Sequence, residues 1–266
     1  MSVGVSFGTE LRRWRQALGL SQLRLAVEAD VSARHLSFIE TGRSQPSREM
    51  VLHLAAQLRV PLREQNALLL AAGFAPAFPE RDMGAPEMSA IREAAALVLA
   101  NHEPYPAIAI DRRRDVVMAN RAAPLLLGDV APALRGPPLN IYRVLLHPEG
   151  LAPRIINFAP YARHLIARLQ RDARASGEAA LLALLAEVEA YPGVGAGVGE
   201  TPPASADGAL LLRLQDGAGE LAFITTLATF GAAQEITTSE LVIEALLPAN
   251  ERTRVRWREL AGAAIT

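Results

Sequence analysis

The stretch SQLRLAVEADVSARHLSFIETGRSQPS, residues 21–47, predicts two short helices joined by a tight turn. Ser21 and Ser32 each precede a segment with helical apolar spacing, where a serine hydroxyl can accept from the free amides of the first turn. Between them, Ala29-Asp30-Val31 is the predicted turn, because aspartate tolerates left-handed backbone better than most residues. One inward stripe of apolar side chains results, made of Leu25, Ala26, Val31, Leu36 and Ile39.

The polar side chains at the start of the second helix remain exposed in this arrangement. Two-helix motifs of this kind place that end of the helix in the major groove of DNA. Because arginine can pair bidentately with guanine, Arg34 is the first choice for a residue that selects the DNA sequence. The alternative is that Arg34 is an ordinary surface arginine on a small helical domain. The candidate residues of this helix are Ser32, Ala33, Arg34, His35 and Ser37.

Three further helices are expected around this pair, at residues 6–18, 47–58 and 61–72. Ser6 and Ser47 are placed to cap two of them, and Pro61 suits the start of the third. Gly73 follows as a helix end. The sequence therefore predicts an N-terminal all-α domain of five helices.

Residues 7–71 resemble an XRE-type (Cro/C1-like, lambda-repressor-like) helix-turn-helix domain. The resemblance implies a double-stranded DNA operator as partner, with Gln22 on a phosphate or base edge and Arg43 and Ser44 on the DNA backbone. Asp30 departs from the glycine that is usual in this family. The matching segments are Leu20-Ser21-Gln22, Val31-Ser32, Phe38-Ile39-Glu40-Thr41-Gly42 and Pro46-Ser47.

Composition and charge support a globular chain of two domains. The 266 residues are 50% hydrophobic with a formal net charge of -1, but residues 1–75 hold nine arginines against six acidic residues, a net of +3. The absence of cysteine excludes disulfides, thiolate zinc sites and cysteine nucleophiles. Neither a leader-like N-terminus nor an apolar run of about 18 residues is present, so we expect a cytoplasmic protein without membrane contact.

The segment APAFPERDMGAP, residues 75–86, indicates a domain boundary because it holds three prolines and a glycine. We therefore predict a DNA-binding domain at 1–75, a linker at 76–90 and a second domain at 91–266. The second domain begins with a helix at 87–101. An overall two-domain α+β protein follows.

The second domain is predicted to be an antiparallel five-stranded sheet with helices packed on one face. The expected strands lie at 107–111, 116–120, 210–214, 221–228 and 241–247, and helices lie at 121–127, 139–146, 158–174 and 178–190. We interpret Arg112-Arg113-Arg114 as a solvated hairpin turn rather than a second DNA contact, and the glycine- and proline-rich residues 192–208 as a mobile loop. Asn250 is expected to cap a final helix.

This order of strands and helices resembles the PAS fold, and several segments are similar to the ligand-binding domain of MmyB-like transcription regulators. The resemblance implies a dimeric small-molecule sensor. Asn250 stands where that family often has aspartate. The matching segments are Asp115-Val116-Val117, Asn120-Arg121-Ala122-Ala123, His147-Pro148-Glu149-Gly150-Leu151, Asn157-Phe158, Thr229-Phe230-Gly231, Glu240-Leu241-Val242-Ile243-Glu244 and Pro248-Ala249-Asn250.

Apolar side chains dominate both the helices and the strands, so a cavity between them would be apolar with a few polar contacts. A fatty acid, another fatty-acyl compound or a similar amphipathic molecule is the expected ligand class, although the same side chains can also form a solid core. Glu244 either pairs with a buried arginine or faces solvent. The candidate ligand contacts are Val117, Asn120, Arg121, Leu126, Tyr142, His147, Phe158, Tyr161, Leu165, Phe223 and Thr225.

The leading hypothesis is a homodimeric transcription regulator that binds a roughly palindromic operator and responds to a small-molecule effector. An enzyme fused to a DNA-binding domain is disfavoured, since no serine after residue 87 lies in a GxSxG motif and no acid–base or metal-ligand set is evident. We expect no required cofactor and no metal. A third hypothesis is a ligand-free dimerisation or protein-interaction scaffold.

Overall fold

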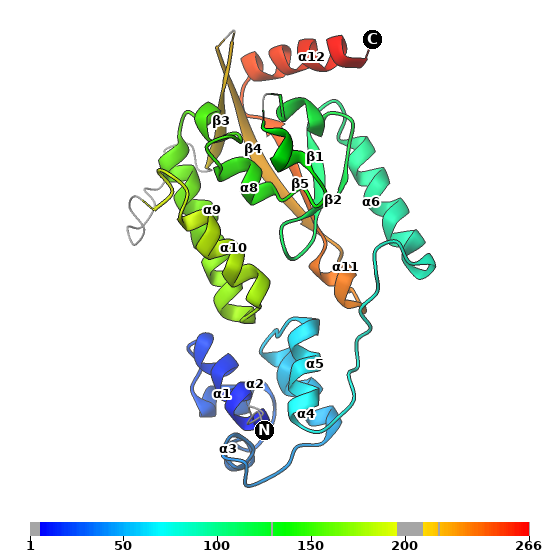
Figure 1. Cartoon of the computed structure of the whole chain (residues 1–266). Helices are drawn as coiled ribbons and strands as arrows, with labels where there is room; N and C mark the ends of the chain where they lie inside the picture. The colour runs from blue at the N-terminus through cyan, green and yellow to red at the C-terminus, as the bar shows by residue number, and fades with distance from the viewer. Residues whose placement is uncertain (1–5, 129, 196–209, 218, 266) are drawn as a thin grey trace. The chain divides into compact units, whose positions relative to one another are not determined.

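The computed structural model describes residues 6–128, 130–195, 210–217 and 219–265 of the chain. Two compact units are present (Figure 1). The first continues to Asp82 and also includes Gly231–Ser239, a segment far away in the sequence. The second comprises Met83–Phe230 and Glu240–Thr266.

The first unit holds the five predicted helices, α1 (Phe7–Ala17), α2 (Gln22–Glu28), α3 (Ala33–Glu40), α4 (Arg48–Gln57) and α5 (Leu62–Ala71). The predicted serine caps are confirmed, because the hydroxyls of Ser6, Ser21, Ser32 and Ser47 each accept from a backbone N–H three residues later. Asp30 has φ 50°, as the left-handed turn requires. These caps fix where each helix of the motif begins.

A single apolar core holds these helices together, with Leu11, Leu25, Leu36 and Leu54 completely buried. Gly8 allows α1 to approach α3, since a Cβ there would lie 2.5 Å from the carbonyl oxygen of Ile39. Only glycine permits this backbone contact. The close contact at Gly8 and the shared apolar core therefore fix the position of α3 relative to α1 and α2.

The second unit is built on an antiparallel sheet in the order β2-β1-β5-β4-β3. Its strands are β1 (Ala107–Ile110), β2 (Val116–Ala119), β3 (Leu211–Asp216), β4 (Gly219–Thr229) and β5 (Val242–Pro248). The predicted hairpin is β1–β2, but Val117 is an extra residue between the pairs Ala109–Met118 and Ile110–Val116. This β-bulge changes which β2 side chains face each side of the sheet.

Helices cover both faces of the sheet, so the prediction of one covered face was wrong. The helix α6 (Ser89–Asn101) packs Ala95 and Leu99 against Ala107, Ala109 and Ile243 on one face. The larger core lies on the other face, under α8 (Ile141–Leu146), α9 (Phe158–Ser176) and α10 (Ala179–Glu189). The short runs of strand residues could not reveal this, because a strand buried on both faces has no polar alternation.

The remaining elements are short or terminal. Asn250 caps α12 (Glu251–Ile265) through the N–H of Thr253, as predicted, and Trp257 of α12 packs edge-on against Phe223 with ring centroids 5.4 Å apart. Residues 196–208 of the predicted loop lie outside the described residues. The short helices are η1 (Pro86–Met88), η2 (Ala123–Leu126), α7 (Pro132–Arg135), η3 (Ala152–Arg154) and α11 (Ile236–Glu240).

The arginines of the β1–β2 turn are not simply solvated, which corrects the sequence interpretation. Arg112 pairs with Glu178 at 2.6 Å and with Glu240 at 3.0 Å. Arg114 is 6% exposed, pairs with Asp172 and lies over the ring of Tyr142. Their partners come from distant parts of the chain, so the two guanidinium groups hold the turn against α9, α10 and the end of α11.

A cluster around Glu235 anchors the linker of the first unit. Its carboxylate accepts from the backbone N–H groups of Arg81, Thr237 and Thr238 at 2.7–3.1 Å, while the Thr237 hydroxyl donates to the Arg81 carbonyl at 2.6 Å. Burial favours a higher pKa for Glu235, but these hydrogen bonds outweigh it and lower the pKa. We call this cluster the Glu235 clasp. It joins residues of the linker to the connection between β4 and β5.

Candidate functional sites

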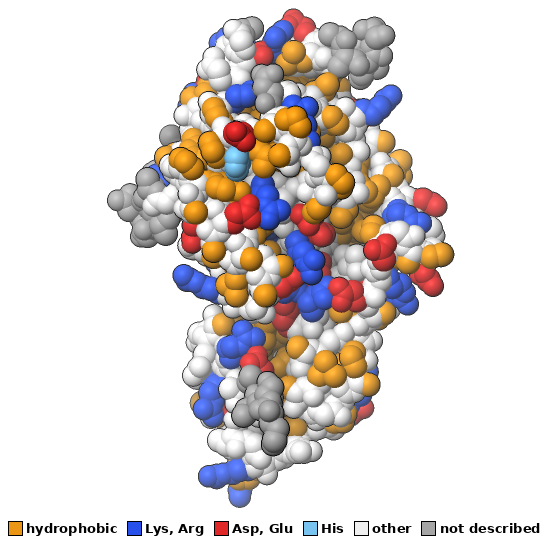
Figure 2. Space-filling view, in the orientation of Figure 1, with side chains coloured by type: hydrophobic (Ala, Val, Ile, Leu, Met, Phe, Trp, Pro, Cys, Tyr) orange, Lys and Arg blue, Asp and Glu red, His pale blue; other side chains and the backbone are white. Residues whose placement is uncertain are grey.

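The exposed end of α3 carries the first candidate site. Arg34 is exposed, and its guanidinium lies over the Phe38 ring at 5.3 Å from the centroid. Ser32 and Ala33 are also exposed, whereas His35 and Ser37 are half-buried. Figure 2 shows arginine side chains gathered at the edge of the first unit over α3 and the loop that follows. That loop carries Arg43, which is exposed, and Ser44, which is half-buried.

A buried ion pair sets the position of Gln22 beside this surface. Glu40 at the end of α3 accepts two hydrogen bonds from Arg15, at 2.6 and 2.9 Å, and one from the Gln22 side-chain amide at 2.7 Å. Burial favours a raised pKa for Glu40, yet the bonds from Arg15 and Gln22 prevail and the pKa lies below its ordinary value. The Gln22 amide therefore has a defined direction, with its N–H on Glu40.

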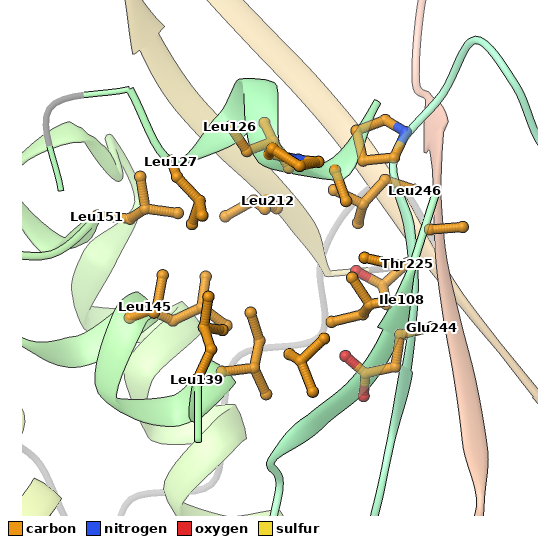
Figure 3. Close-up of a pocket in the computed structure, with 18 of the residues that line it drawn as sticks. Ile108, Leu126, Leu127, Leu139, Leu145, Leu151, Leu212, Thr225, Glu244 and Leu246 are labelled. Carbon is orange, nitrogen blue, oxygen red and sulfur yellow. The ribbon is translucent and has the colours of Figure 1, made fainter. Parts of the chain in front are cut away.

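The second candidate site is an apolar cavity of about 140 Å³ in the second unit (Figure 3). It lies between the sheet and the segments around η2, α8 and η3, within the larger apolar core on that face of the sheet. Leucine and alanine side chains form most of the wall, and the side chains with polar groups are Tyr161, Thr225 and Glu244. The sheet contributes Ala107, Ile108, Val116, Ala119, Leu212, Thr225, Glu244 and Leu246.

Three of the predicted ligand contacts line this cavity, namely Leu126, Tyr161 and Thr225. Val117 does not, because the bulge in β2 directs Val116 and Ala119 to the cavity and leaves Val117 38% exposed. Ligand contact by the three lining residues remains a prediction.

The other predicted ligand contacts lie outside the wall of this cavity and contact other parts of the second unit. The side-chain oxygen of Asn120 accepts from the N–H groups of Ala107 and Ala123, and its side-chain NH₂ donates to the carbonyl of Tyr105. Arg121 is exposed beside Glu103. The His147 ring packs edge-on against Tyr191. Tyr142, Phe158, Leu165 and Phe223 belong to the core or pack against it, outside the cavity wall.

Glu244 is the lining residue whose role the sequence did not determine. It pairs with Ile108 across β1 and with Leu227 across β4, and its carboxylate accepts from Arg168 of α9 at 3.1 Å. The sequence alternative of an arginine partner is thereby supported, but Arg168 is half-buried, with its side chain 21% exposed, rather than buried. The alternation of Glu244 with Leu246 in β5 was the available signal, since residues two apart in a strand share a face.

The polar groups near Glu244 are held in their neutral forms. Burial is the main cause that raises the pKa of Tyr161, and the negative charge of Glu244 adds to it. Burial likewise raises the pKa of Tyr142, against the effect of Arg114. The phenol of Tyr161 therefore stays protonated at neutral pH and can donate a hydrogen bond in the cavity wall.

No described helix has the length and apolar character needed to cross a membrane. The described residues also contain no group of three or more His, Asp or Glu side chains placed to hold a metal ion.

Comparison with known proteins gives a match for each unit. Residues 91–260 match the family model of the MmyB-like transcription regulator ligand binding domain, and residues 11–65 match a helix-turn-helix model. The chain is 41% identical over 75 residues to the uncharacterized HTH-type transcriptional regulator RghRB of Bacillus subtilis (strain 168). That alignment covers 28% of this chain and 52% of the relative, so the chain spans about half the length of the curated relative it matches.

Proposed function

The chain belongs to the MmyB-like transcription regulators, with a helix-turn-helix domain and that family's ligand binding domain, and on this premise we propose that a small apolar ligand controls its binding to DNA. The observation that carries the proposal is the apolar cavity in the second unit, lined from both the sheet and the helical segments. A ligand there changes DNA binding only if it binds two states of the protein with different affinity.

The size and walls of the cavity support a compact apolar ligand. A cavity of about 150 Å³ lined by aliphatic side chains can hold benzene, and this cavity has a volume of about 140 Å³. A ring or a short fatty-acyl chain fits that space, while a longer fatty acid requires side chains to move. No cofactor is needed for such a role, and we propose a non-enzymatic regulator.

The DNA-binding half of the proposal rests on the exposed end of α3. We propose that Arg34 reads a base edge and that Arg43 and Ser44 contact the backbone, with a homodimer on a roughly palindromic operator in the cytoplasm. The PAS-like description of the second unit is part of the same proposal and is supported by the strand order β2-β1-β5-β4-β3.

A selection from a random duplex pool tests the DNA half directly. The expected result is enrichment of one roughly palindromic sequence by the full-length protein, with two copies of the chain per duplex in native mass spectrometry. Failure to enrich any sequence contradicts the proposal.

Two neighbouring valines provide a matched test of the ligand half. Val116→Phe fills the cavity, whereas Val117→Phe adds the same group at an exposed position. We expect benzene or hexanol to change the affinity of the wild type and of Val117→Phe for the selected duplex, and to have little effect on Val116→Phe. A measurable and equal change in all three proteins places the ligand elsewhere.

A second candidate function is a ligand-free dimerisation or interaction scaffold. The observation in its favour is the size of the cavity, since ligand pockets usually enclose about 300–1,000 Å³. This function predicts a dimer in native mass spectrometry, no apolar adduct, and no effect of benzene or hexanol on DNA binding by any of the three proteins.

A further inference from the structure

One of the residues that line the cavity carries a negative charge. Glu244 lines the cavity, and Figure 3 shows its carboxylate directed from the sheet toward the cavity. Its side chain is only 15% exposed, so water screens its charge poorly. Among the described residues that line the cavity there is no arginine.

The cation that balances Glu244 lies outside that wall. Arg168 donates to one carboxylate oxygen, Oε1, through a single Nη1–H group at 3.1 Å. The described contacts contain no hydrogen bond to the other oxygen, Oε2. Two carboxylate oxygens offer about four acceptor positions, so Glu244 keeps free acceptor capacity on the side of the cavity.

The two hydroxyl groups near Glu244 do not favour a carboxylate over a hydrogen-bond donor. Tyr161 and Thr225 line the same cavity, and the Thr225 hydroxyl interacts with the Tyr161 phenol. Both groups can donate as well as accept. They can therefore bond a hydroxyl or an amine as readily as a carboxylate, and the fixed negative charge of Glu244 decides between them.

We propose that the cavity selects an apolar ligand that carries a hydrogen-bond donor, a hydroxyl or an amine, and rejects one that carries an ionised carboxylate. This inference rests on the proposed ligand-sensing function and specifies its ligand class. A free fatty acid places a second negative charge beside a poorly solvated carboxylate, which is unfavourable without an added cation. A fatty alcohol, an alkylamine or an acyl amide places an O–H or N–H group there instead.

Four small probes test the proposal on the full-length protein at neutral pH by isothermal titration calorimetry. Benzene reports on the apolar cavity alone, while hexanol, hexylamine and hexanoate share one chain and differ in the head group. We expect hexanol and hexylamine to bind at least about 10-fold more tightly than hexanoate, which corresponds to about 1.4 kcal/mol. Hexanoate binding as tightly as hexanol overturns the proposal.

The variant Glu244→Gln assigns the selection to the carboxylate. It should bring the affinity for hexanoate to within about 3-fold of that for hexanol, because the amide removes the charge and keeps the shape. Glu220→Gln is the matched control, since Glu220 is also a sheet glutamate paired with an arginine, Arg213, but lies outside the cavity wall. Loss of selection in the control, or its persistence in Glu244→Gln, contradicts the role given to Glu244.

The same series separates failure of this inference from failure of the proposed function. If benzene and all three hexyl probes bind without preference, the cavity is a ligand site and the head-group inference is wrong. If none of the four binds, the proposed function fails and the inference fails with it.

Discussion

Two glutamate–arginine pairs, one in each unit, show how the same chemistry can serve different ends. Glu40 is completely enclosed, and both its oxygens receive hydrogen bonds, from Arg15, Gln22 and Arg12. Glu244 receives one bond from Arg168 and lies in a cavity wall. A carboxylate whose acceptor positions are filled by its own protein holds a fold, whereas one with positions left open toward a cavity can recognise a ligand.

The largest expected effect separates the two pairs by stability. Glu40→Ala leaves the Arg15 guanidinium buried without its carboxylate partner, with its hydrogen bond to the Leu20 carbonyl retained, and should lower the free energy of unfolding of the first unit by about 3–5 kcal/mol. Glu244→Ala should cost about 1 kcal/mol in the second unit, because Arg168 keeps some access to water and can be hydrated. Urea-dependent hydrogen exchange on peptides from each unit measures both values. Equal losses of unfolding free energy in the two variants contradict the distinction drawn between the two pairs.

A smaller effect is expected when two arginines of the first unit are compared, one paired with a carboxylate and one not. Arg15 is occupied by Glu40, but the described contact of Arg34 is the face of the Phe38 ring. Arg34→Ala should therefore weaken binding to the selected duplex by about 1–3 kcal/mol, or roughly 5- to 150-fold in Kd.

A charge-matched control accompanies this measurement. Arg254→Ala removes an exposed arginine of α12 that pairs with Glu251, so the net charge changes equally. Fluorescence anisotropy should show the larger loss only for Arg34→Ala. Equal losses for the two variants mean that Arg34 acts through bulk charge alone.

Lowering the pH should destabilise the Glu40 pair less than substitution of Glu40 does. The pKa of Glu40 is lowered in the folded protein, so its contribution to stability is fully present above its ordinary value of 4.5 and is lost as pH falls through the folded pKa. Urea unfolding of the first unit between pH 6 and pH 3 should show a component of acid destabilisation that is absent in Glu40→Gln. A pH profile identical in the two proteins contradicts this assignment.

The smallest expected effect concerns the turn of the helix-turn-helix. Asp30 has φ 50°, where a side chain is mildly strained. Asp30→Gly should stabilise the first unit by about 0.5 kcal/mol, because relief of strain slightly exceeds the added entropy of the unfolded chain. Asp30→Ala is the opposite control and should destabilise the unit, since alanine tolerates a left-handed backbone less well than aspartate does. Thermal unfolding of both variants measures the difference.

Local signals in the sequence predicted most of the first unit but less of the cavity. Serine caps act within three residues, so Ser21 and Ser32 define helix starts directly. The cavity depends on contacts between distant residues. Arg168 and Glu244 are 76 positions apart, and the side-chain directions of β2 depend on a bulge at Val117. Periodicity alone cannot reveal such a bulge, because one extra residue reverses the pattern.

The Glu235 clasp has a consequence for anyone who builds chimeras from these proteins. A gene fragment that ends at residue 82 encodes the helix-turn-helix core but omits Gly231–Ser239, which belongs to the same compact unit. The backbone N–H of Arg81 would lose its carboxylate partner, and the linker would lose its attachment. A functional exchange of DNA-binding modules between relatives therefore needs two segments to be exchanged, the N-terminal part and the β4–β5 connection.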